Sequence, residues 1–150
     1  MALNVPGLVR LPSDEEINAY LTDGAVVLRG VLDAEFVLAM AEPIERLMRE
    51  PEMADMTAMG DGLEATGETV LRDASQRRGR FISGVDHWLR YASFRDFACS
   101  SGVPAIVSTL FGSSKVNLWE DSVLVKEPGT GERTAWHQDL SYFHVAGEQL

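Results

Sequence analysis

The sequence has one cysteine, few basic residues and no long apolar run, and each shortage excludes a class of protein. Cys99 alone cannot form a disulfide within the chain or a cysteine-rich zinc module, so a reducing cytoplasm is the expected compartment. Only 13 Lys and Arg residues stand against 23 Asp and Glu residues, which gives a formal net charge of −10. Nucleic acids and anionic membranes bind positive surfaces, so neither is an expected partner.

Targeting signals and nucleotide-binding loops are also missing. No stretch approaches the roughly 20 apolar residues of a membrane span, and the first residues lack the apolar core of a secretory signal. Neither a Gly-x-Gly-x-x-Gly loop nor a Walker loop occurs. With 150 residues, 45% of them hydrophobic, the chain is expected to form one domain, 1–150, with its own core.

Two helices are predicted near the N-terminus from their capping residues. Ser13 and Glu16 form a capping box at the start of the first helix, and Gly24 is placed to end it. Asp33 is placed to cap the second helix, whose apolar residues follow a helical spacing. Pro43 lies within that spacing and should kink the helix or split it in two.

Two further helices are predicted in the second half of the chain. The first covers residues 86–98 and contains His87, which we take as a surface or core histidine rather than a metal ligand. The second begins near Pro104, a residue favoured in the first turn of a helix, and ends at Gly112.

Runs rich in β-branched and aromatic residues indicate strands. Short strands are expected at Ala25–Gly30 and Phe81–Ile82, and the longest signal is Lys115–Lys126. A strand alternates its side chains, so in this longest run every second residue shares a face. The turn-rich residues 127–133 would then return the chain into an antiparallel partner at Thr134–Asp139.

The segment between about Met53 and Gly79 shows no regular period. It fits a long loop, but Met53, Met56 and Met59 at three-residue spacing fit one turn of a buried helix equally well. A basic cluster, Arg77–Arg80, follows. Both a solvated surface role and the binding of an anionic ligand are open for this cluster, and the first is the simpler.

The stretch with the most chemical content is Trp136-His137-Gln138-Asp139. On an extended strand, His137 and Asp139 would point to the same side, with their Cα atoms about 6.5 Å apart. A neutral imidazole and a carboxylate suit a first-row transition metal, and they are two of the three ligands in a two-His-one-carboxylate site. The pattern His-x-Asp also occurs without a metal, so the tripeptide alone leaves both interpretations open.

Three features occur in a characteristic order along the chain: residues 24–32, a helix ending Leu110-Phe111-Gly112, and Lys126-Glu127-Pro128-Gly129 followed by Trp136-His137-Gln138-Asp139. Together they resemble the phytanoyl-CoA dioxygenase family of iron(II)- and 2-oxoglutarate-dependent oxygenases. The last feature is the most specific of the three. The resemblance implies an α+β fold with a mainly β core, in which N-terminal helices precede a double-stranded β-helix, or jelly roll.

The resemblance also implies a reaction and a site. His137 and Asp139 would be iron(II) ligands, and 2-oxoglutarate would chelate the metal. Molecular oxygen and a small organic substrate would complete the reaction, which yields a hydroxylated product, succinate and carbon dioxide. Ser122 is implied as a contact to 2-oxoglutarate, so it joins the candidate cofactor-binding residues. Lys126 shares its strand face but is expected to be a surface lysine.

The family takes its third iron ligand, and the Arg that binds the far carboxylate of 2-oxoglutarate, from strands downstream of His-x-Asp. Only eleven residues follow Asp139, so the chain is expected to be the N-terminal portion of a longer enzyme with an incomplete jelly roll. A second chain that completes the fold, or a non-catalytic metal- or ligand-binding remnant, is the alternative. A cupin-like metal hydrolase or isomerase without a need for 2-oxoglutarate is a further one.

Overall fold

A computed structural model describes residues 5–57, 79–130, 134, 137–139 and 143. They form helices and a small antiparallel sheet, which confirms the expected mixture of the two. The chain divides into two compact units, unit 1 (Met1–Glu50 and Val85–Ser122) and unit 2 (Pro51–Gly84 and Val123–Leu150). Within the described ranges, no helix has the length and apolar character that crossing a membrane requires.

Helix α1 (Asp14–Asp23) begins and ends where its caps predict. The Ser13 hydroxyl accepts a hydrogen bond from the Glu16 N–H at 3.3 Å, and the Glu16 carboxylate accepts one from the Ser13 N–H at 2.8 Å. Gly24 ends the helix in the left-handed conformation, with φ 74°, and its N–H donates to the Tyr20 carbonyl. Glycine adopts this conformation without the steric cost that a Cβ brings.

The second predicted helix is split, as its proline required. Helix α2 (Ala34–Leu38) is capped by Asp33, whose carboxylate accepts from the Phe36 N–H at 2.9 Å. Helix α3 (Ala41–Leu47) follows after a break of two residues. The break leaves Pro43 in the first turn of α3, where a helix makes no use of a backbone N–H.

The single helix predicted over residues 86–98 is wrong. The structure has a 3-10 helix η2 (His87–Leu89) and then helix α5 (Ala92–Cys99). Asp86 precedes η2 with a positive φ of 61°, and Tyr91 is extended just before α5. These two backbone conformations interrupt a helix that the apolar spacing alone would continue.

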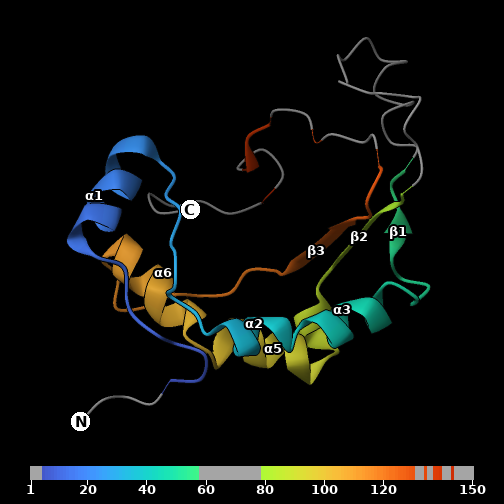
Figure 1. Cartoon of the computed structure of the whole chain (residues 1–150), viewed down its shortest axis with the longest axis horizontal. Coiled ribbons are helices and arrows are strands. Elements are labelled where there is room, and N and C mark those ends of the chain that lie inside the picture. The colour runs from blue at the N-terminus through green and yellow to red at the C-terminus, as the bar shows by residue number, and fades with distance from the viewer. Residues whose placement is uncertain (1–4, 58–78, 131–133, 135–136, 140–142, 144–150) are drawn as a thin grey trace. The chain divides into compact units, whose positions relative to one another are not determined.

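Helix α6 (Val103–Phe111) ends as predicted at Gly112, which has φ 60°. Ring contacts join the helices of unit 1 in pairs. Tyr20 of α1 stacks on Phe111 of α6 with centroids 6.1 Å apart, and Phe36 of α2 stacks on Phe97 of α5 at 5.5 Å. The ribbons of α2 and α5 accordingly run beside each other in Figure 1.

The sheet has three strands in the order β1 (Ala54–Asp55), β2 (Phe81–Val85) and β3 (Ser122–Lys126). Strands β1 and β2 are antiparallel, with Ala54 opposite Ser83. The strand predicted at Phe81–Ile82 is confirmed, and of the one predicted over Lys115–Lys126 only the last five residues form a strand. The described residues therefore make a small open sheet and not a complete jelly roll.

The strand predicted at Ala25–Gly30 is wrong, because its backbone groups are not paired with a neighbouring strand. The Arg29 carbonyl accepts instead from the Arg10 guanidinium at 2.6 Å. In the methionine-containing segment, Met53 and Met56 flank strand β1 and so do not form a helical turn. Met59, Arg77 and Arg78 lie outside the described residues.

Buried hydrophobic residues occur in both units. Unit 1 contributes Val31, Leu47, Phe94 and Ile106, three of them from helices, and unit 2 contributes Phe81 and Ile82 from β2. The expectation of a mainly β core is therefore wrong for the described residues. His87 is buried at 4% exposure and lies next to the rings of Tyr91 and Phe94, so it is a core histidine.

Candidate metal centre

The motif that leads toward His137 begins with a tight turn after β3. The Thr130 N–H donates to the Glu127 carbonyl at 3.1 Å, and Gly129 has φ 82°. Pro128 and Gly129 occupy the two central positions, which is the arrangement of a type II turn. Proline presets the first central φ, and glycine tolerates the positive φ of the second.

An ion pair joins this turn to the start of β2. The Arg80 guanidinium donates to the Glu127 carboxylate at 2.7 Å from Nη2, and Nε lies 3.2 Å from each carboxylate oxygen. The Arg80 N–H donates to the same carboxylate at 2.8 Å. These bonds lower the pKa of Glu127, the guanidinium contributing most and the backbone N–H next. Arg80, the last residue of the basic cluster, is thus engaged by an acid of this chain.

Lys126, expected to be a surface lysine, makes two contacts in unit 2. Its ammonium lies 4.8 Å from the centre of the Phe81 ring, a cation–π distance. It also donates a hydrogen bond to the Thr134 hydroxyl at 3.1 Å. Thr134 precedes His137 by three residues, so this bond ties β3 to the segment that carries the candidate ligands.

His137 and Asp139 meet, although not on a strand. The His137 Nε2 atom lies 3.0 Å from the Asp139 Oδ1 atom. The Asp139 carbonyl accepts a hydrogen bond from the Phe143 N–H at 3.2 Å. The strand predicted over Thr134–Asp139 is therefore wrong for its described residues. The described backbone at His137 and Asp139 is not in a strand, so alternation along a strand is not what brings the two side chains together.

The separation of these two atoms fits ligands of one metal ion. Donor atoms that each lie about 2.1 Å from an ion, at a right angle, are about 3.0 Å apart. The side chains are 41% and 75% exposed, so an ion can reach them from solvent. A direct ion pair of a protonated histidine has the same separation. Across the described parts of the chain, no group of three or more His, Cys, Asp or Glu is arranged to hold a metal.

Ser122, the candidate 2-oxoglutarate contact, is the first residue of β3 and belongs to unit 1. The face that it was predicted to share with Leu124 and Lys126 is the exposed one, and Val123 and Val125 are half-buried. Its hydroxyl donates to the Glu120 carboxylate at 3.4 Å. The strand alternation is confirmed, and the contact to 2-oxoglutarate stays a prediction.

The phytanoyl-CoA dioxygenase family model matches residues 20–150. The chain belongs to this family. Its members are generally oxygenases and typically depend on iron and 2-oxoglutarate. Neither the comparison with curated proteins nor that with solved structures finds a match. The match includes the turn after β3 and the His137–Asp139 pair, the part of the sequence with the most specific resemblance.

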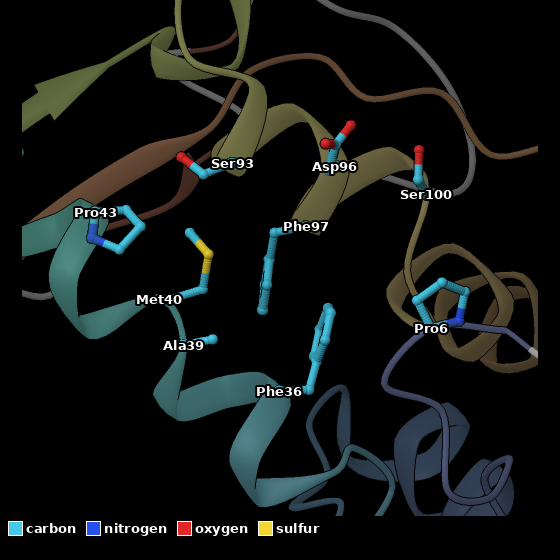
Figure 2. A pocket seen from close by; sticks show the side chains of 9 residues that line it. All are labelled: Pro6, Phe36, Ala39, Met40, Pro43, Ser93, Asp96, Phe97 and Ser100. Atoms are coloured by element: carbon cyan, nitrogen blue, oxygen red, sulfur yellow. The ribbon is translucent and has the colours of Figure 1, made fainter.

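Unit 1 of this family member contains an apolar groove of about 520 Å³. Phe36 of α2, Met40 between the two helices and Pro43 of α3 line one side, and α5 lines the other (Figure 2). Among the described residues that line it, Asp96 alone is charged. The groove has the size and character to accept a small apolar group next to one carboxylate.

Within the described part of unit 1, three buried polar atoms have no hydrogen-bond partner: His87 Nε2, Trp88 Nε1 and Asp121 Oδ2. The other carboxylate oxygen of Asp121 accepts from the Trp88 N–H at 3.1 Å, so this aspartate caps η2. Sequence reasoning missed this cap, as it missed the Arg80–Glu127 pair. Both join residues more than 30 positions apart, and no local pattern signals such a contact.

Proposed function

We propose that this protein is an iron(II)- and 2-oxoglutarate-dependent dioxygenase that hydroxylates a small organic molecule. The observation that carries the proposal is the 3.0 Å separation of His137 Nε2 and Asp139 Oδ1, in the motif where the family match is most specific. An imidazole nitrogen and a carboxylate oxygen are two of the three ligand types of non-haem iron oxygenases.

The roles of the chain's own residues follow from their chemistry. Neutral His137 would offer its Nε2 lone pair, and ionised Asp139 would offer an oxygen that otherwise pairs with the histidine. Iron bound there, together with 2-oxoglutarate, supplies an oxidant for an unactivated C–H bond, with succinate and carbon dioxide as co-products. Ser122 is proposed as a weaker contact to 2-oxoglutarate.

The proposed architecture is the N-terminal portion, 1–150, of a jelly-roll domain. It is supported by the family match and by the antiparallel sheet that ends at the motif. The proposed compartment is the cytoplasm, since the sole cysteine, Cys99, is an exposed free thiol.

Two measurements test the proposal. The first is anaerobic calorimetric titration of iron(II) into the protein, its Asp139→Ala variant and, as a matched control, the Asp23→Ala variant at the end of α1. Asp139→Ala should lose binding, and Asp23→Ala should bind as the parent does. Equal binding by all three proteins would remove Asp139 from the site.

The second measurement is succinate formation with iron(II), 2-oxoglutarate and oxygen. Formation of succinate that depends on both His137 and Asp139 supports the oxygenase. Metal binding without any succinate, across a panel of small organic substrates, would favour the non-catalytic module instead. Turnover that needs metal but no 2-oxoglutarate would favour a hydrolase or isomerase.

A further inference from the structure

The ends of strands β2 and β3 are joined more firmly than their backbone pairing requires. Arg80 stands directly before β2, and Glu127 directly after β3. The Glu127 N–H donates to the Arg80 carbonyl at 2.9 Å, as in an antiparallel pair. Four further hydrogen bonds run from Arg80 to the Glu127 carboxylate. A guanidinium that grips a carboxylate through several donors also fixes its orientation.

The backbone before Arg80 lies against the turn as well. A Cβ at Gly79 would be 2.6 Å from the Glu127 carbonyl oxygen and 2.7 Å from the Pro128 carbonyl oxygen. Both distances are shorter than a side chain tolerates, so only glycine allows this approach. The type II turn is thus held by the Gly79 backbone and by the Arg80 side chain together.

A second tether lies beyond the turn. The Lys126 ammonium makes a cation–π contact with the Phe81 ring and donates to the Thr134 hydroxyl at 3.1 Å. From Thr134 the chain can extend only about 10 Å before it reaches His137. The segment that carries His137 therefore leaves the sheet from a point fixed on both sides of the turn.

We propose that Arg80, acting through Glu127, is a positioning residue for metal binding by His137 and Asp139. The inference rests on the proposed function. Its physical reason is that the two ligands are 41% and 75% exposed, so burial alone does not fix their orientation. Their geometry depends on the segment that precedes them, and groups that support metal ligands commonly change metal affinity about 10- to 100-fold.

The chain offers a matched control for this role. Arg10 and Glu16 form an equivalent pair in unit 1, with guanidinium-to-carboxylate bonds of 2.7 and 2.8 Å. Arg80→Met and Arg10→Met each remove the charge and the donors but keep the apolar stem. Both variants should unfold at a lower temperature than the parent. Only Arg80→Met should also bind iron(II) about 10-fold more weakly in anaerobic calorimetry on the folded protein.

The outcomes distinguish a failure of the positioning role of Arg80 from a failure of the proposed function. Iron(II) affinity of folded Arg80→Met equal to that of the parent overturns the inference and leaves the proposed function standing. A parent protein that binds no iron(II), or binds it undiminished after His137→Ala, overturns both. If Arg80→Met does not fold, Glu127→Gln keeps the shape of the acceptor without its charge. Several-fold weaker binding by Glu127→Gln supports the inference, and parental affinity contradicts it.

Discussion

The two units contain the same kind of ion pair, built over different distances in the sequence. Arg10 and Glu16 are six residues apart, and Glu16 also completes the capping box of α1. Arg80 and Glu127 are 47 residues apart and join the ends of two strands. The first pair strengthens a helix start that local residues already determine. The second exists only once β2 and β3 have paired.

This contrast extends to the rest of each unit. Helices α1, α2 and α6 of unit 1 begin or end at capping residues, glycines or a proline that lie within a few residues of them. The described part of unit 2 relies on contacts across the sheet, such as Lys126 on Phe81. Substitutions at these contacts of unit 2 should therefore act on partners distant in the sequence, and those at the helix caps of unit 1 on their neighbours.

The largest effect is expected from the core of unit 2. Phe81 is 4% exposed and carries Lys126 on its ring. Phe81→Ala should lower the free energy of unfolding by about 3–5 kcal/mol, because it leaves a cavity and removes the ring that the Lys126 ammonium contacts. Urea denaturation measures the loss. Leu124→Ala, at a 56% exposed position of β3, is the control and should change it by less than about 0.5 kcal/mol.

Substitution of one glycine in each unit allows the stability losses of the two units to be compared directly. Gly79→Ala would press a Cβ against the Glu127 and Pro128 carbonyls of the turn. This substitution should lower the free energy of unfolding by about 1–3 kcal/mol, because the backbone of the turn must move to make room for the Cβ. Gly24→Ala meets no atom within 4 Å but keeps a φ of 74°, and should cost about 1 kcal/mol. Thermal unfolding of both variants ranks them, and a larger loss at Gly24 would reverse the comparison.

The N-terminal cap of α1 provides a smaller effect. Ser13→Ala removes the hydroxyl that accepts from the Glu16 N–H, and should lower the free energy of unfolding by about 1 kcal/mol. Ser13→Asp keeps an acceptor at the cap and should retain most of the stability. Urea denaturation measures the free energy of unfolding of the two variants and of the parent. An equal loss in both would mean that the cap contributes little.

The smallest effect expected is a change in the pH dependence of stability. The pKa of Glu16 is lowered to about 2, first by the side-chain hydrogen bond from Arg10 and then by the Ser13 N–H. A carboxyl with a depressed pKa in the folded state stabilises it above the unfolded pKa, about 4.3, and this contribution is lost as the pH falls toward 2. The parent should therefore exceed Arg10→Met in unfolding temperature at pH 6, and the gap should narrow between about pH 4.3 and 2. A gap that is constant with pH would show that the guanidinium acts through packing alone.

Much of the fold could be predicted where the cause is local. The capping box of Ser13, the stops at Gly24 and Gly112 and the split before Pro43 were all predictable, since each acts within one or two turns of its helix. The strand predicted at Ala25–Gly30 failed for the opposite reason. β-propensity selects residues that suit a strand, but a strand also needs a partner, and Arg10 binds the Arg29 carbonyl instead.

The candidate site shows the same division. The residue types of His137 and Asp139, and their spacing, predict a metal-binding pair without any coordinates. Their approach to 3.0 Å occurs without the expected strand, since the described residues 134 and 137–139 are not in a strand.

The sequence by itself thus determined the residue types at the motif, the ends of α1 and α6 and the membership of the phytanoyl-CoA dioxygenase family. Only the tertiary structure decided which arginine meets which glutamate and where the segment before His137 is tied. The physical reason is the sequence separation of the interacting residues. Caps and turns depend on backbone conformations only a few residues apart. An ion pair across 47 residues depends on the register of two strands, which no local pattern contains.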